Sequence, residues 1–264
     1  MTRRLTNAFM LLCIGVVLWS SSAIAQTPSG LEVRVRYDVF LGGFFTATIV
    51  VDSALNGTKY EITSTIETHG IVRILTGFQS RAHSNGTRTE NGFKPTIYQA
   101  RNLWGGGERS VRNDYAADGS VENHAIPSNI EDGRDPVPNS RMMNTTDPLS
   151  AALAVMFGYA NTGTCSHETR IFDGRRLFDI RLTANKADTV DGPFYKGPAE
   201  RCLMRRDRLI GFSTDPWLPR SKSPPVIEIW FARLSDRLPP LPVHAAADTG
   251  IGIGQIHLKE FQIK

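Results

Sequence analysis

The sequence predicts a mainly β protein: a single strongly curved antiparallel sheet, open or a half barrel, wrapped around one buried helix near residues 147–160. Apolar and polar residues alternate along several segments, which is the period of a strand with one buried face. Asn-Gly and Asp-Gly dipeptides, which favour tight hairpin turns, recur along the chain. One further segment is apolar on nearly every side of a helix, which indicates a buried helix.

The first strand is predicted at residues 31–39, where apolar residues alternate with charged ones in the order Leu-Glu-Val-Arg-Val-Arg-Tyr-Asp-Val. The same alternation returns at residues 60–66, 178–182, 227–231 and 256–258. Successive side chains of a strand point to opposite faces of the sheet. Each segment should therefore present one apolar face to the core and one polar face to water.

Glycine-containing dipeptides mark the predicted turns. Asn56-Gly57 and Asp173-Gly174 each lie between two strand-like runs, and both tolerate the positive φ of a hairpin turn. The run 41–45, Leu-Gly-Gly-Phe-Phe, is predicted as a bulge that sharpens the curvature of the sheet, or as an apolar lip at the mouth of a pocket. Frequent tight turns favour an antiparallel meander.

The predicted helix begins after Asp147, a good N-cap residue, with Pro148 at its first position. Gly163 can end it. Its natural place is the concave face of the curved sheet, because that face can surround an apolar helix. The segment is too short to cross a bilayer, which takes roughly 20 apolar residues.

Residues 1–25 have the three parts of a cleavable secretory signal: Arg3 and Arg4, an apolar run at residues 8–19, and the triplet Ala23-Ile24-Ala25. We expect export to the periplasm and a mature chain, 26–264, that forms a single β-rich domain. The apolar run at 8–19 is too short to span a bilayer, so a cleaved signal is favoured over an uncleaved membrane anchor. No transmembrane segment is expected in the chain that remains after cleavage.

Two cysteines follow the signal segment, Cys165 and Cys202. In an oxidising compartment such a pair is expected to form a disulfide. The alternative is a metal site built from Cys165 and His167, but the further ligands that a structural metal site needs are missing at the usual spacing.

Motifs of well-known enzyme and nucleotide sites are missing from the sequence. It contains no G-x-S-x-G, no P-loop and no H-E-x-x-H, and no metal or cofactor is predicted. Basic and acidic residues are mixed, and cleavage of the signal lowers the formal net charge from +4 to +2, because Arg3 and Arg4 leave. Nucleic-acid binding is therefore not predicted. For an enzyme, the first suspects would be Asp179, His167 and Glu168, which lie near one another in the sequence.

Several short motifs taken together resemble an exported bacterial family, the domain of unknown function 3108. They are Tyr-Asp-Val-Phe-Leu-Gly-Gly at 37–43, Pro-Thr-Ile-Tyr at 95–98, Asp-Pro-Leu-Ser at 147–150, Arg-Arg-Leu-Phe-Asp at 175–179 and Leu-Pro-Val at 241–243. The resemblance implies a strongly curved antiparallel sheet around a helix, similar in shape to periplasmic lipoprotein carriers and to spiral β proteins of the envelope. It implies no catalytic residues.

The leading functional hypothesis is a non-enzymatic periplasmic envelope protein that binds a lipid, an acyl group or a lipoprotein segment in a concave apolar groove. The predicted groove residues are Val33, Val35, Tyr37, Ile49, Val51, Ile62, Leu149, Leu153 and Met156. The helix itself could instead fill that groove.

Two alternatives remain open at this stage. The first is a structural or interaction module that supports envelope integrity through protein contacts, made by the loops 127–146 and 213–225 or by an open sheet edge. The second is a secreted enzyme with an unrecognised site.

Overall fold

The computed structural model describes residues 30–90, 92–213, 225–250 and 252–264; the predicted signal at 1–25 lies outside them. The strands are β1 (Leu31–Leu41), β2 (Phe44–Asn56), β3 (Lys59–Thr68), β4 (Gln79–Thr89), β5 (Gly92–Trp104), β6 (Gly107–Tyr115), β7 (Val121–Ile126), β8 (His167–Phe172), β9 (Leu177–Asp191), β10 (Lys196–Ile210), β11 (Ile227–Ala232), β12 (Leu241–Asp248) and β13 (Ile253–Ile263). The helices are α1 (Gly70–Thr76), α2 (Asn139–Met142) and α3 (Pro148–Thr162).

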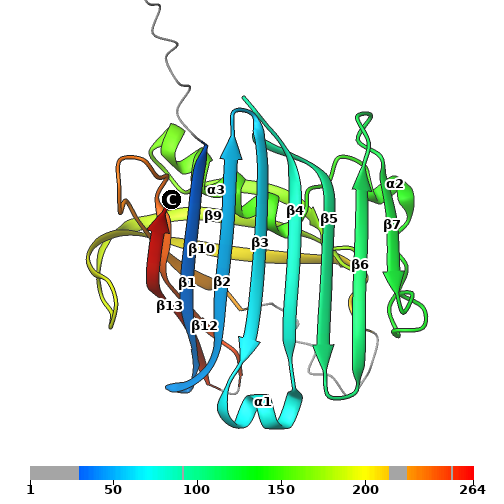
Figure 1. Ribbon diagram of the computed structural model, residues 1–264, viewed down its shortest axis with the longest axis horizontal. Coiled ribbons are helices and arrows are strands. Elements are labelled where there is room, and N and C mark those ends of the chain that lie inside the picture. Colours follow the sequence, from blue (N-terminus) through cyan, green and yellow to red (C-terminus); the bar gives the residue numbers. More distant parts are fainter. Residues whose placement is uncertain (1–29, 91, 214–224, 251) are drawn as a thin grey trace, which may run out of the picture.

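All described strands belong to one 13-stranded antiparallel sheet (Figure 1). Its order is β7-β6-β5-β4-β3-β2-β1-β13-β12-β11-β10-β9-β8. The first and last strands, β1 and β13, pair in the middle of the sheet, whereas β7 and β8 form its two edges. These edge strands do not pair with each other, so the sheet is open. The predicted fold class, one curved antiparallel sheet with a helix packed on it, is confirmed.

The predicted alternation of β1 appears directly in its burial. Val33 and Val35 are buried, whereas Glu32, Arg34 and Arg36, which alternate with them, are exposed. Opposite them, Val35 pairs with Val51 of β2, so that two apolar side chains adjoin on the inner face. Burial of such side chains is the main force that holds the two strands in this register.

The glycine turns are partly as predicted. Gly57 and Gly174 adopt positive φ, +59° and +88°, in the β2–β3 and β8–β9 turns. The predicted bulge at 41–45 is wrong: Gly42 and Gly43, with φ of +57° and +86°, form the β1–β2 turn itself. Two consecutive residues at positive φ are what a tight two-residue hairpin needs. The irregularity in the β1–β2 register lies just before it, between Val39 and Phe40.

Helix α3 begins and ends where the sequence predicts. The Asp147 carboxylate accepts hydrogen bonds from the backbone N–H groups of Leu149 at 2.9 Å and Ser150 at 3.0 Å. Gly163 ends the helix with a left-handed φ of +73°. The helix contacts β3, β4 and β5 on one side and β8 on the other. It therefore fills part of the space that the curved sheet encloses. No described helix is both long and apolar enough to span a bilayer.

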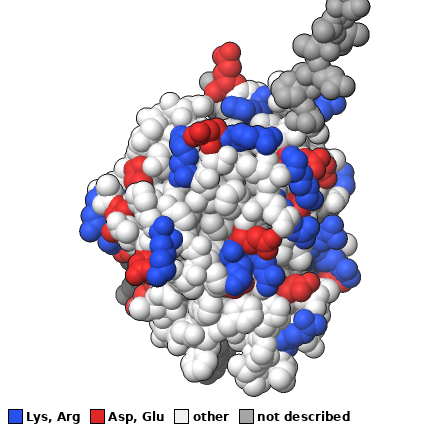
Figure 2. All heavy atoms as spheres, turned by 60° about the vertical axis from the view of Figure 1, so that its left-hand side comes forward, with Lys and Arg blue, Asp and Glu red and all other residues white. Residues whose placement is uncertain are grey.

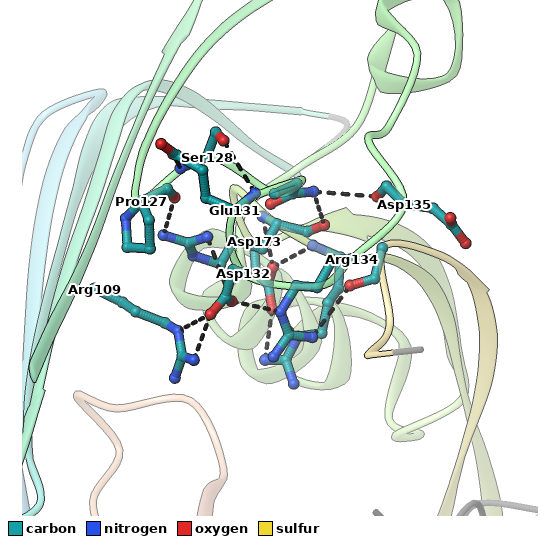
Figure 3. A network of polar contacts seen from close by, with 12 residues as sticks. Arg109, Pro127, Ser128, Glu131, Asp132, Arg134, Asp135 and Asp173 are labelled. Atoms are coloured by element: carbon teal, nitrogen blue, oxygen red, sulfur yellow. Dashed lines mark hydrogen bonds and ion pairs between the residues drawn. The ribbon is translucent and has the colours of Figure 1, made fainter. Parts of the chain in front are cut away.

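Four charged side chains, the edge latch (Arg109, Asp132, Arg134 and Arg175), join the two edges of the sheet. Figure 3 shows Arg109 and Arg134 on either side of Asp132. The nearly buried Asp132 carboxylate accepts from the guanidinium groups of Arg109 and Arg134 and lies 3.6 Å from that of Arg175. Burial alone would raise the pKa of Asp132, but the hydrogen bonds from Arg134 and Arg109 outweigh it and the pKa is lowered. The latch therefore holds a carboxylate between three cations.

Arg175 connects the two edge strands, β7 and β8, which do not pair with each other. It lies in the β8–β9 turn and donates to the carbonyls of Ile126 at 2.9 Å and Pro127 at 2.8 Å, at the end of β7. Asn123 of β7 donates to the carbonyl of Gly174 at 3.0 Å. Side chains thus replace the missing backbone ladder between β7 and β8, and hold the sheet in its curved form.

Candidate functional site

A cavity of about 450 Å³ lies between helix α3 and the inner face of the sheet. Helix α3 therefore leaves part of the enclosed space open. The cavity is bordered by both halves of the sheet, from β1, β2, β3 and β5 on one side and from β8 to β13 on the other. All nine predicted groove residues border it: Val33, Val35, Tyr37, Ile49, Val51, Ile62, Leu149, Leu153 and Met156. That they bind a ligand stays a prediction.

Sequence reasoning missed much of the wall. Some of the additional side chains come from strands whose pattern carries no distinctive signal, namely β5, β10 and β12. The larger ones among them are Leu31, Leu55, Tyr60, Phe93, Phe157, Ile171, Phe178, Ile180, Leu182, Met204, Ile229, Phe231, Leu238, Leu241 and Ile256. Alternation had indicated that residues 178–182 and 227–231 face a core, but not that they face the same cavity as β1.

The described residues that line the cavity include no aspartate, glutamate, lysine, arginine or histidine. Its polar side chains are Tyr37, Ser53 and Tyr60. Met156 lines the cavity where three apolar clusters of the core adjoin, because it packs against each of them. Such a wall favours an apolar guest, since a charged group would lose its hydration without gaining a partner.

Tyr37 places a free hydroxyl in this wall. Its side chain has no hydrogen-bond partner among the described residues, and burial raises its pKa far above the ordinary value of 10.0. The phenol is therefore neutral at physiological pH and retains an unused O–H donor.

Tyr60 is tied instead to the start of the helix. Its hydroxyl lies 2.6 Å from Ser150 Oγ, and the Ser150 hydroxyl donates to Asp147 at 2.5 Å. Ser84 of β4 also donates to Asp147, at 2.9 Å. Burial raises the pKa of Asp147, although these hydrogen bonds act in the opposite direction. Burial likewise raises the pKa of Tyr60, to about 12. This helix anchor (Tyr60, Ser84, Asp147, Ser150) fixes one wall of the cavity against the sheet.

A cation lies beside the cavity. The guanidinium of Arg88 stacks 4.6 Å from the ring centre of Phe157, which lines the wall. Arg88 is half-buried and opposes Phe93, another wall residue, across the β4–β5 ladder. It takes part in none of the ion pairs among the described residues, so its donors are available. Nothing in the local sequence around Arg88 signals this position.

The suspected catalytic residues lie in separate contacts. Asp179 accepts two hydrogen bonds from Arg170, at 2.8 and 3.0 Å, and Glu168 accepts two from Arg181, at 3.0 and 2.9 Å. Burial lowers the pKa of His167. The structure thus ties each carboxylate to its own arginine and brings no shared site together from these three residues.

Cys165 and Cys202 form the predicted disulfide. Glu200 lies beside it, with its carboxylate 3.8 Å from Cys165 Sγ. These three residues are close enough to hold a metal, but both sulfurs are already used in the disulfide. The bond ties the segment after α3 to strand β10.

Comparison with known proteins identifies a fold and a family. The chain is similar to a crystal structure described as a beta-barrel-like protein of domain of unknown function DUF1849 from Brucella abortus, with a TM-score of 0.52 and 13% sequence identity. The match covers 89% of this chain and 99% of that one, and at this identity it shows the fold alone. No curated protein matches the sequence. The family model described as "Protein of unknown function (DUF3108)" matches residues 32–259, and the chain therefore belongs to this family.

Proposed function

We propose that this protein is a non-enzymatic binding protein of the cell envelope that holds one acyl chain in the cavity beneath α3. The observation that carries the proposal is the cavity itself. Its volume of about 450 Å³ lies within the ~300–1,000 Å³ of small-molecule sites, and its wall is apolar. Each methylene of a bound ligand that becomes buried contributes about 0.8 kcal/mol. The free energy of binding therefore becomes more favourable as the acyl chain becomes longer. The predicted signal at residues 1–25 supports a periplasmic location.

The test is a binding titration with a fluorescent long-chain fatty acid. We expect saturable binding to the wild-type protein, and an affinity at least about tenfold lower for Met156→Trp, a difference of about 1.4 kcal/mol. The reason is that Met156 lines the cavity and a tryptophan there occupies the space of the guest. Native mass spectrometry of protein purified gently from the envelope should show an added mass that extracts as lipid.

Two variants serve as controls for this titration. Met156→Leu keeps the volume of the wall and should bind as the wild type does. Ala160→Trp adds the same ring at an exposed position of α3 and should also leave binding unchanged. Saturable binding that is equally strong in Met156→Trp would show that the guest lies elsewhere. A wild-type protein that binds no long-chain probe would overturn the proposal.

The position of Arg88 leads to a prediction about the ligand's head group. A guanidinium at the side of an uncharged cavity can pair with a carboxylate or phosphate while the chain lies in the apolar space. We expect Arg88→Gln to weaken hexadecanoate binding about tenfold, in line with ~1.5–3 kcal/mol for a charge-assisted hydrogen bond, reduced because Arg88 is only half-buried.

Hexadecanol is the matched ligand, because it has the same chain and no charge. Its affinity should be equal for the wild type and Arg88→Gln. Isothermal titration calorimetry of both ligands with both proteins separates the contribution of the charged head group from that of the apolar chain. Equal losses for acid and alcohol would mean that Arg88 supports the wall rather than the head group.

A further inference from the structure

Four turns meet at one end of the sheet, at the bottom of Figure 1, and we name their described residues the apolar tip: 41–46, 69–78, 103–107, 248–250 and 252–254. Backbone hydrogen bonds join them into one surface. The Gly42 N–H donates to the Ile253 carbonyl at 3.0 Å, that of His69 donates to the Thr46 carbonyl at 2.8 Å, and that of Gly105 donates to the Thr76 carbonyl at 2.7 Å. The tip therefore has a defined backbone.

Large apolar side chains on the tip face solvent. Ile74 is 79% exposed and Phe44 is 76% exposed. The full set is Phe44, Phe45, Ile71, Ile74, Leu75 and Ile253. Half of these residues belong to α1, a helix that buries none of its residues. Core packing does not explain why this helix is apolar, because a short helix normally gains its stability from a buried face. A cluster of exposed large apolar residues indicates an interaction surface.

The charges around these side chains narrow the kind of partner. Among the described residues of the tip the only aspartate or glutamate is Asp248, whose carboxylate accepts from the Gly250 N–H at 2.9 Å, and the only arginine or lysine is Arg73 in α1. In Figure 2 the lowest lobes of this end are white, with basic side chains just above them, whereas the body carries both signs throughout. An apolar surface with so few charges suits the interfacial layer of a membrane, and the exposed Arg73 can pair with an anionic lipid head group.

The shape of the tip favours a bilayer over a folded partner. The apolar side chains stand on turns and on an exposed helix at the extremity of the molecule, so they project outward instead of lining a hollow. Fluid acyl chains can surround such projections, and amphipathic surfaces of this kind bind in the interfacial layer. We propose that the apolar tip docks this protein on a lipid bilayer by shallow insertion of Phe44, Ile74, Leu75 and their exposed neighbours. This inference does not depend on the cavity beneath α3.

The proposal is tested by flotation of the protein with vesicles of phosphatidylethanolamine and phosphatidylglycerol. We expect the wild type to float with the vesicles. The double variant Phe44→Ser/Leu75→Ser should lose at least about tenfold in partitioning, because two exposed apolar side chains no longer enter the interface. Arg73→Gln should reduce partitioning by a smaller factor, about fivefold, and only on vesicles that contain phosphatidylglycerol.

Two further variants separate insertion from misfolding. Met143→Ser removes an exposed apolar side chain next to the β6–β7 turn, away from the tip, and should float as the wild type does. Phe44→Trp should keep binding and shift its fluorescence to shorter wavelength on vesicles. If the wild-type protein does not float with vesicles of any composition, the proposal is wrong. A wild-type dimer that becomes monomeric in Phe44→Ser/Leu75→Ser would also overturn it, since the tip would then be a protein interface.

Discussion

Replacing Asp147 by alanine should lower the free energy of unfolding by about 3–4 kcal/mol. The carboxylate is fully buried, caps α3 through the N–H groups of Leu149 and Ser150, and accepts from the hydroxyls of Ser84 and Ser150. Loss of a helix cap costs about 1 kcal/mol, and each buried polar group left without a partner costs about 1–3 kcal/mol. Relief of the buried charge offsets part of this sum. Chemical denaturation monitored by circular dichroism measures the difference.

Asp147→Asn is the matched control. Asparagine is an equally good cap residue, and its amide can bond to the same two serines, so the cost should stay below about 1 kcal/mol. An alanine variant as stable as the asparagine variant would show that the helix anchor contributes little to stability.

The wild type and Asp147→Asn should also differ in how their stability depends on pH. Burial raises the pKa of Asp147 above its ordinary value of 3.8. The contribution of this group to stability is therefore complete below the unfolded pKa and is lost as the pH rises through the folded pKa. The wild type should lose stability relative to Asp147→Asn between pH 3.8 and the raised folded pKa. A difference that stays constant over this range would contradict the assignment.

Removing the disulfide should cost about 4 kcal/mol, the chain-entropy value for a loop of this length. Cys165 and Cys202 are separated by 37 residues, and both are buried. The midpoint of thermal unfolding of Cys165→Ala/Cys202→Ala should fall by roughly 10 °C. The bond ties the segment that follows α3 to β10, so hydrogen exchange should also accelerate in α3 and in strands β8 to β10.

Wild-type protein unfolded with a reductant present provides the comparison. If loop closure is the cause, the reduced protein and the double alanine variant should unfold at nearly the same midpoint, because both lack the cross-link. A reduced protein as stable as the oxidised one would show that the bond constrains little of the unfolded chain.

The local features of this fold could be predicted from sequence because each depends on neighbours along the chain. The alternation of Val33 and Val35 with charged residues indicates that β1 has one buried and one solvent-exposed face, independently of which strands pair with it. Asp147, Pro148 and Gly163 determine the ends of α3 through hydrogen bonds and backbone angles within a few residues. The pairing of Cys165 with Cys202 could be predicted because only these two cysteines follow the predicted signal segment.

Local pattern was therefore sufficient to predict the fold class, the helix on the concave face, the disulfide and nine residues of the cavity wall. The pairing of β1 with β13, the contact of Arg175 with both sheet edges and the space of about 450 Å³ beside α3 could be seen only in the folded chain. The tertiary structure alone placed Arg88 against Phe157 and gathered four turns into the apolar tip. These features depend on contacts between segments far apart in the chain, and neither residue periodicity nor local motifs encode which segments meet.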